Sequence, residues 1–305
     1  MTVIRNIAPA IVAAEIRMNF FSLNMIIGAS TNAAIYQHFA SKNFTEIILI
    51  LNQIKTRHAG TAKMKDKRFV INKIVTDIES RSRNKAKDYF NTGKFFCMKK
   101  DDTLKEIGVS LIWRGYKYNR KIVENCLIKT ADDSNWEVRE YAGGAFANTL
   151  NSNPEFYIKL KMLTKHKSEN VRRAVVFSAL GLLEKEKPER AFKLLEPLLY
   201  DSSAYVKRNL GPFIIGSYFF RKFPEATLRQ MKKWSKIKNE NVRWNIIMSF
   251  KNSFGLNNPE YAFEILKEFT QEKDKMTCRV LKSVLNFLSK KHKHSVDRFK
   301  ENFEI

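Results

Sequence analysis

The sequence predicts an all-α solenoid, a stack of similar helix pairs, and two ladders of short motifs carry this prediction. The first ladder is a hydrophobic residue followed by a basic one: Val138-Arg139, Val171-Arg172, Val206-Lys207, Val242-Arg243 and, more loosely, Cys278-Arg279, at steps of 33, 35, 36 and 36 residues. The second ladder is a Pro-Glu pair that begins at Pro154, Pro188, Pro224 and Pro259, at steps of 34, 36 and 35 residues. Two interleaved ladders of one period indicate a repeated unit of about 35 residues.

Each Pro-Glu pair is expected to begin the first helix of a unit. Proline lacks the N–H that the first helical turn leaves unbonded, and the glutamate faces the positive end of the helix dipole. The second helix is expected to begin after turn-forming polar residues that can cap its free amides, at residues 132–135, 201–203 and 239–241. Each unit is therefore predicted to be a helix, a turn and a second helix.

The second helix of each unit carries a hydrophobic stripe. Counting the valine of the first ladder as position 0, positions +4 and +8 are Ala142 and Phe146, Val175 and Ala179, Leu210 and Ile214, and Ile246 and Phe250. Residues four apart lie on one helix face, so this stripe is the predicted buried face. A unit with one apolar face on each helix can bury it only against its neighbours, as solenoids do.

The repeat also predicts the division of the chain. Residues 101–115 are expected to supply a further second helix, so that about six units fit. The Val-Arg start of the second helix resembles HEAT repeats, which implies a right-handed solenoid. Residues 1–80 show helical stretches but no repeat. We therefore expect an N-terminal helical segment at 1–80 and a HEAT-like repeat domain at 81–305.

The composition points to a polyanionic partner. Lys and Arg number 55 against 31 acidic residues among 305, which gives a formal net charge of +24. Nucleic acid and an anionic membrane surface both satisfy such a charge. No run of eighteen apolar residues occurs, so a transmembrane helix is not expected. Cys97, Cys126 and Cys278 lie far apart and are expected to be reduced thiols. We expect no metal, no cofactor, a monomer, and a location in the cytoplasm, with the nucleoid, or in a nucleus.

The side of the second helix that faces away from the stripe has an unusual composition. Position +2 lies about 160° from the stripe, and positions −2 and +6 share its side. Position +2 holds Glu140, Arg173, Arg208 and Trp244; position −2 begins with Trp136; position +6 holds Gly144, Phe177, Pro212 and Met248. Arginine forks bind phosphates and aromatic rings stack on bases, so these columns predict a groove that binds nucleic acid.

Two interpretations are open for the basic residues at position +1. They are Arg139, Arg172, Lys207 and Arg243. They lie at the edge of the predicted core, where they either pair with an acid of the next repeat or join Arg208 and Trp244 in binding DNA. Trp136 is open in the same way, as a hydrophobic staple over its helix start or as a ligand-binding ring. Trp234, late in a first helix, is expected in the core.

The residues around these columns resemble a known family. Trp136-Glu-Val-Arg-Glu140, Glu169-Asn-Val-Arg-Arg173 and Tyr205-Val-Lys-Arg-Asn-Leu-Gly211, in this order and spacing, resemble the HEAT-like-repeat alkylpurine DNA glycosylases of the AlkC/AlkD type, over about residues 101 to 290. The resemblance implies that double-stranded DNA lies in the concave groove and that bases alkylated at N3 or N7 are removed. It implies a catalytic role for Trp136 and Glu140, with Arg173, or else Arg172, as the nearby arginine.

The chemistry of base excision suits this set. An N-alkylated purine is cationic, and its glycosidic bond breaks toward a positively charged sugar, which a carboxylate stabilises while it orients water. The π-face of Trp136 would contribute about 0.5 to 2 kcal/mol toward the cation. The sequence departs from the family at Pro212, where AlkD-like enzymes carry a second catalytic-site tryptophan. The alternatives are a HEAT-like module that binds damaged or branched DNA without chemistry, and a protein-interaction scaffold.

Overall fold

The computed structural model describes Leu51, Lys55 and residues 59–183 and 188–304. Within this part of the chain the regular elements are helices, and the one β-bridge joins Lys55 to Ala62. The all-α prediction is therefore confirmed. The chain divides into two compact units, residues 1–153 and 154–305, which are described separately.

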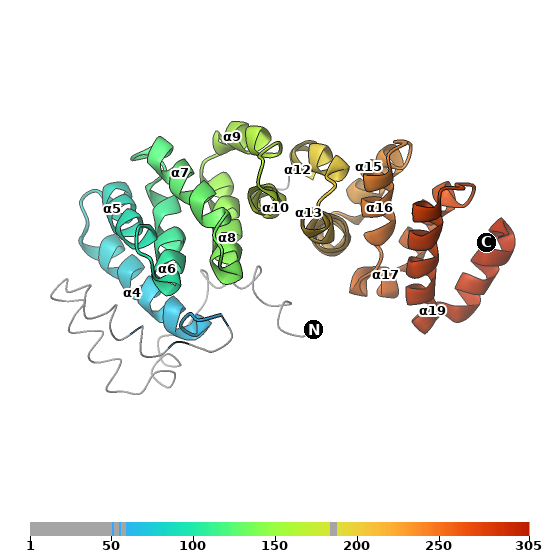
Figure 1. Ribbon diagram of the computed structural model, residues 1–305, viewed down its shortest axis with the longest axis horizontal. Coiled ribbons are helices and arrows are strands. Elements are labelled where there is room, and N and C mark those ends of the chain that lie inside the picture. Colours follow the sequence, from blue (N-terminus) through green and yellow to red (C-terminus); the bar gives the residue numbers. More distant parts are fainter. Residues whose placement is uncertain (1–50, 52–54, 56–58, 184–187, 305) are drawn as a thin grey trace. The chain divides into compact units, whose positions relative to one another are not determined.

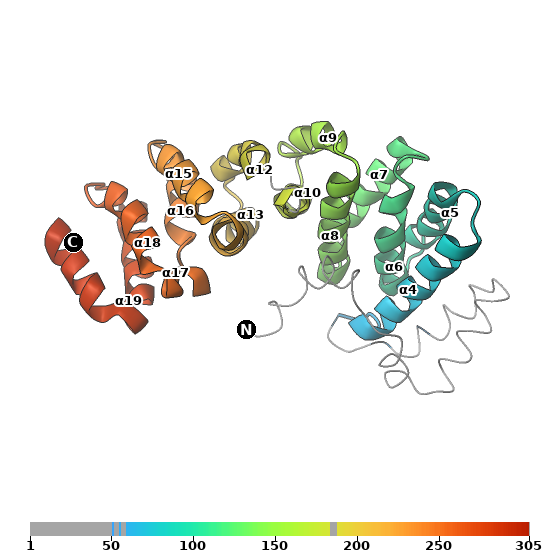
Figure 2. The ribbon, with the colours of Figure 1, turned by 180° about the vertical axis from the view of Figure 1, so that it is seen from behind.

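The first unit contains five α-helices among the described residues (Figures 1 and 2). They are α4 (Met64–Arg81), α5 (Lys85–Cys97), α6 (Asp102–Ile112), α7 (Arg120–Ala131) and α8 (Trp136–Ser152), with a 3-10 turn, η3 (Trp113–Gly115), after α6. In both views α5 to α8 lie side by side, and α4 crosses α6 obliquely.

The second unit continues the alternation of first and second helices. Its elements are α9 (Phe156–Leu163), α10 (Glu169–Ser178), α11 (Leu180–Leu183), α12 (Pro188–Leu195), η4 (Glu196–Tyr200), α13 (Ala204–Asn209), η5 (Leu210–Phe219), α14 (Phe220–Lys222), α15 (Pro224–Trp234), α16 (Glu240–Met248), α17 (Ser253–Asn257), α18 (Pro259–Leu266), η6 (Lys267–Phe269) and α19 (Lys275–Phe303). Three of the four Pro-Glu pairs begin a first helix, as predicted, and after Pro154 the helix begins two residues later.

The second helices of the described pairs all begin in the same way, with a capping side chain. In α6, α8, α10, α13, α16 and α19 this side chain accepts a hydrogen bond from a backbone amide of the first turn; the caps are Asp101, Asn135, Ser168, Ser203, Asn239 and Asp274. Capping by such residues stabilises a helix by about 1 kcal/mol. Six helix pairs therefore follow one another within the described residues, the number predicted.

The caps also correct the register of the last repeat. In the earlier repeats position 0 lies three residues after the cap, as Val242 does after Asn239. The cap Asp274 therefore places Thr277, which is fully buried, at position 0 in α19, rather than Cys278. The ladder of hydrophobic residues places this repeat one residue too late, because its position 0 is a threonine.

The predicted hydrophobic stripe is confirmed. Each residue at positions 0, +4 and +8 of α8, α10, α16 and the helix formed by α13 and η5 is at most 1% exposed. Trp234 is also in the core, 1% exposed, and its indole N–H donates to Glu196 Oε2 at 3.1 Å.

The first unit includes a contribution from the chain before residue 81. Phe69, Val70, Ile74 and Ile78 of α4 lie in one hydrophobic cluster with residues of α5 and α6. The crossing of α5 and α6 is close at Gly108, where an added Cβ would lie 2.4 Å from the backbone nitrogen of Cys97. The division of the chain at residue 80 stays a prediction.

Pro212 lies in a π-helical stretch, η5, that continues α13 without a break. Proline has no N–H to donate to the preceding turn, which favours such a departure from α-helical bonding. The carbonyl oxygen of Pro212 accepts a hydrogen bond from Asn252 Nδ2 at 2.9 Å.

Candidate nucleic-acid interface

The basic residues at position +1 take part in contacts between repeats. Arg172 contacts Asp201 of the next repeat through Nε at 2.5 Å and Nη2 at 3.1 Å, and its Nη1 donates to the carbonyls of His166 and Lys167. Arg243 contacts Glu272 at 2.6 Å and Asp274 at 3.0 Å. For these two arginines the inter-repeat interpretation is confirmed.

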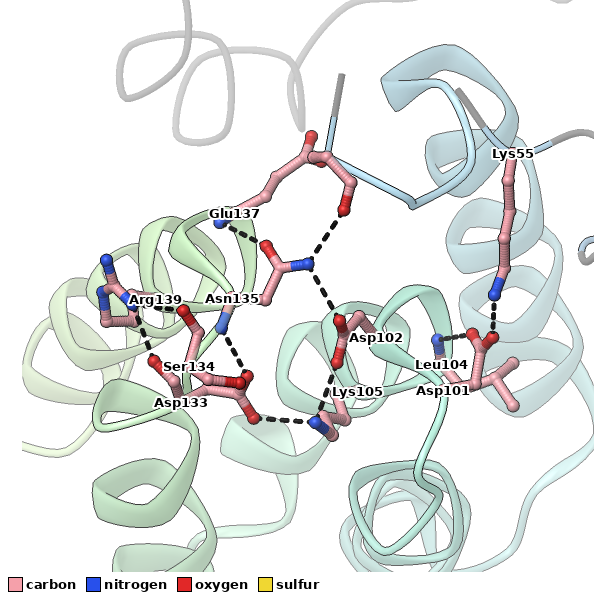
Figure 3. A network of polar contacts seen from close by, with 11 residues as sticks. Lys55, Asp101, Asp102, Leu104, Lys105, Asp133, Ser134, Asn135, Glu137 and Arg139 are labelled. Carbon is pink, nitrogen blue, oxygen red and sulfur yellow. Dashed lines mark hydrogen bonds and ion pairs between the residues drawn. The ribbon is translucent and has the colours of Figure 1, made fainter. Parts of the chain in front are cut away.

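The remaining position +1 residues make related contacts. Lys207 Nζ donates to Asn241 Oδ1 of the next repeat at 2.9 Å, and burial lowers the pKa of Lys207. Arg139 Nη1 donates to the carbonyls of Asp133 and Ser134 at 2.7 and 2.8 Å (Figure 3). DNA binding by these side chains stays a prediction, and each would have to share its structural contacts with a phosphate.

The structure adds Lys105 to this column. It occupies position +1 of α6 and pairs with Asp102 and with Asp133 of the next repeat, both at 2.8 Å (Figure 3). The sequence ladder missed it because Leu104 replaces valine at position 0. The cap Asp101 is the signal that would have found it.

Replacing Arg172 with Ala is expected to destabilise the second unit. The substitution leaves the carboxylate of Asp201, only 6% exposed, without its cation, and hydrogen bonds to charged groups contribute about 1.5 to 3 kcal/mol. We expect urea unfolding followed by circular dichroism to show a loss of this size. A variant as stable as the wild type would mean that Arg172 is available for another role.

The +2 column is more exposed at some positions than at others. Arg208 is exposed and Glu140 and Trp244 are half-buried. The corrected register adds Arg279 of α19, which is exposed. The Lys207 ammonium lies 5.2 Å from the centre of the Trp244 ring. In the second unit, this column therefore presents two exposed arginines and, between them in sequence, a tryptophan.

Arg173 does not face solvent as the helical geometry predicts. It is 5% exposed, and its guanidinium carbon lies 4.5 Å from the ring centre of Phe177 and 4.8 Å from that of Tyr205. Phe177, expected on the same outward side, is itself 6% exposed. The helical period fixes direction but not what lies above the helix, and here the Tyr205 ring of the next repeat packs against Arg173.

Trp136 and Glu140 lie on one face of α8. Trp136 is the first residue of the helix and 39% exposed, and Glu140 follows one turn later. Arg173 belongs to α10 in the second unit. The approach of all three residues to one site is a prediction that neither unit tests by itself.

A buried charge cluster in the first unit was not predicted. The ammonium of Lys67, from α4, lies 2.6 Å from Glu106 Oε2 and 2.9 Å from Glu137 Oε1, and the side chains of Lys67 and Glu106 are fully buried. The Thr61 hydroxyl donates to Glu137, and Lys67 also lies 4.9 Å from the centre of the Tyr141 ring. Sequence periodicity missed the cluster because Lys67 lies outside the repeats.

Glu106 occupies position +2 of α6, the same column as Glu140. Burial raises the pKa of Glu106 to about 8, against the opposing effect of the Lys67 ammonium, and the Glu137 carboxylate raises it further. Two carboxyl groups share one ammonium, so a proton on Glu106 relieves the excess of negative charge.

Stability is therefore expected to fall as the pH rises. A folded-state pKa of about 8 against an ordinary value of 4.5 means that the folded protein holds a proton that the unfolded chain releases. The stabilisation is complete below pH 4.5 and is lost between 4.5 and about 8. Unfolding free energies of the wild type and Glu106→Gln, measured in urea across this range, should differ in slope. Equal slopes would contradict the raised pKa.

Lys55 and residues 59–62 lie against the starts of two second helices. Asn135, the cap of α8, donates from Nδ2 to the Ala59 carbonyl at 2.9 Å and to Asp102 Oδ2 at 2.8 Å (Figure 3). Lys55 pairs with Asp101, the cap of α6, and the Ala62 amide donates to Thr103 Oγ1 at 2.9 Å. The first unit thus places Lys55 and residues 59–62 of its own chain at the starts of α6 and α8.

Three further findings concern the thiols, metal ligands and membrane-spanning helices. Cys97, Cys126 and Cys278 are free thiols, and burial raises the pKa of Cys97 and Cys126. Among the described residues, no group of three or more His, Cys, Asp or Glu side chains is placed to hold a metal ion. The helices described are too short or too polar to cross a membrane.

Comparisons with known proteins give no family. No family model and no curated protein matches the chain. Among solved structures, the chain is similar to YibA of Escherichia coli, with 19% identity over 83% of this chain and 85% of that one and a TM-score of 0.38. It is also similar to a designed armadillo repeat protein, with 18% identity over 72% and 99% and a TM-score of 0.25. Likenesses this weak assign no family, and the helical-repeat fold rests on the chain's own helices.

Proposed function

We propose that the chain binds double-stranded DNA through the second helices of its repeats. The observation that carries this proposal is the +2 column of the second unit, where exposed Arg208 and Arg279 flank Trp244 in the repeat order. Neither guanidinium group forms an ion pair with the described residues. A protein with a net charge of +24 that leaves such groups uncompensated is suited to phosphates.

The salt dependence of DNA binding tests this proposal. Each phosphate contact contributes about 0.9 to the slope of log affinity against log salt concentration on B-DNA. We expect Arg208→Ala and Arg279→Ala each to lower the slope by about that amount, without a change in stability above about 0.5 kcal/mol. Arg229, exposed on the first helix α15, is the matched control, and Arg229→Ala should leave the slope unchanged. Absence of duplex binding at low salt would overturn the proposal.

We further propose that the bound DNA is the substrate of a glycosylase that excises purines alkylated at N3 or N7. The exposed Trp136 ring and the Glu140 carboxyl, one turn apart on α8, support this, because together they offer a cationic base a π-face and a negative charge. Wild-type protein should release N7-methylguanine from methylated duplex. Abasic sites at background level, with duplex binding intact, would leave the chain a module that binds damaged or branched DNA.

A protein-interaction scaffold is the remaining alternative that fits helical repeats. Such a scaffold would show no salt-dependent shift of duplex DNA, so the binding titration separates it from both proposals above.

A further inference from the structure

A row of lysines lies along one edge of the second unit. The residue just before each cap is Lys167, Lys238 or Lys273 in three repeats and Ser202 in the fourth, and the residue three before the cap is a further lysine, Lys165 or Lys236, in two of them. All of these residues are exposed. We call Lys165, Lys167, Lys236, Lys238 and Lys273 the turn row, because they lie in the turns that join first and second helices.

Most acids in the same turns are already engaged. Asp201 pairs with Arg172, and Glu272 and Asp274 pair with Arg243. The Glu169 carboxylate accepts a hydrogen bond from the hydroxyl of Ser203. Among the described residues, no lysine of the turn row forms an ion pair or a side-chain hydrogen bond. Arg172 and Arg243 thus pair with three of the acids at this edge, and the five lysines of the turn row outnumber the two acids there that pair with no cation among the described residues, Glu169 and Glu240.

The corresponding edge of the first unit is different. There the residue before the cap of α8 is Ser134, and the caps of α6 and α8 contact Lys55 and Ala59 of the chain itself. The edge of the first unit is therefore partly covered by its own segment, whereas the edge of the second unit presents lysines to solvent.

We infer that the turn row is a contact for the phosphate backbone of duplex DNA in addition to the +2 column. This inference rests on the proposed DNA binding. Packed helices lie about 8 to 10 Å apart, and one strand of a duplex presents a phosphate about every 3.4 Å along the axis. Successive repeats would therefore reach phosphates about three nucleotides apart. Lysine suits this task, because its flexible stem delivers a point charge and imposes no sequence preference.

A membrane surface fits the turn row less well. Binding to a lipid interface combines basic residues with apolar side chains that enter the bilayer. The large apolar side chains exposed next to these turns are Tyr200, 46% exposed, whose repeat has no turn-row lysine, and Met162, 67% exposed, at the end of α9. The turns of Lys236, Lys238 and Lys273 expose no such side chain among the described residues. The geometry favours a partner that offers regularly spaced charge alone.

The test is a triple variant, Lys167→Ser, Lys238→Ser and Lys273→Ser. Serine is the residue at the equivalent positions 134 and 202, so the turns are expected to tolerate it. The matched control is Lys161→Ser, Lys193→Ser and Lys233→Ser, which removes three exposed lysines from the first helices α9, α12 and α15. Both variants change the net charge equally. We expect the turn-row variant to lower the salt slope of duplex binding by about 2.7, and the control by less than about 1.

The possible outcomes distinguish this inference from the proposal that the chain binds duplex DNA. If the wild type binds duplex and Arg208→Ala lowers the slope, but the turn-row variant keeps the wild-type slope, the DNA-binding proposal stands and the turn row is not a contact. Equal losses in both triple variants would indicate a general charge effect and would also overturn the inference. A wild type that binds no duplex overturns both. Turn-row-dependent binding to phosphatidylserine vesicles, with duplex binding unaffected, would assign the row to a lipid surface instead.

Discussion

Replacing Lys67 with Met is expected to lower the free energy of unfolding by about 3 to 5 kcal/mol when it is measured above the Glu106 pKa of about 8, where that carboxyl is ionised. This is the usual consequence of removing one partner from a buried charge pair. The substitution leaves Glu106 fully buried without its cation, and it also removes a partner of Glu137. Methionine has a similar volume, so the loss reports on charge and hydrogen bonding rather than on a cavity. Urea unfolding followed by circular dichroism measures the effect.

Two companion variants make the measurement specific. Lys65 lies exposed on the same helix, and Lys65→Met should change the stability by less than about 0.5 kcal/mol. The double variant Lys67→Met/Glu106→Leu should recover most of the loss, because apolar residues of similar size replace buried ion pairs without penalty. A Lys67→Met protein as stable as the wild type would show that the cluster contributes nothing to folding.

Replacing Glu140 with Gln is expected to reduce base release by about 100-fold or more, the typical effect of removing a group that stabilises charge in a transition state. Glutamine keeps the size of the side chain but cannot stabilise a positively charged sugar. Single-turnover release of N7-methylguanine from methylated duplex measures the loss. Duplex affinity should remain that of the wild type.

The control for this variant is Glu240→Gln. Glu240 is an exposed acid at position −2 of α16, on the side of the repeats predicted to face DNA. Its replacement should leave base release unchanged. If both variants lose activity equally, or if Glu140→Gln retains full activity, Glu140 is not the catalytic carboxylate.

The repeat architecture was predictable because the signals that mark each unit lie close together in the sequence. The caps, the Pro-Glu starts and the stripe at positions 0, +4 and +8 depend on residues close in sequence, and the structure confirms them. The register of α19 failed by one residue, since a buried threonine, Thr277, stands where a valine was expected. Because of this one-residue error, the sequence pattern did not place Arg279 in the +2 column.

The environment of individual side chains was less predictable. The burial of Arg173 depends on Tyr205, 32 positions later, and the Lys67 cluster depends on a helix outside the repeat. Helical periodicity gives the direction of a side chain, but its exposure is decided by neighbours that are distant in sequence. The same reasoning explains why the +1 residues could be read either as structural pairs or as DNA ligands.

The position of α4 bears on how the chain can be shortened. A fragment that begins at residue 81, where the repeat pattern suggests a boundary, would lose the apolar side chains of α4 that cover Ile107 and Leu111. It would also uncover two carboxylates, Glu106 and Glu137, that share the ammonium of Lys67. In physical terms α4 keeps water away from apolar side chains of α5 and α6. We therefore expect a fragment that begins before Lys55 to be more stable than one that begins at residue 81.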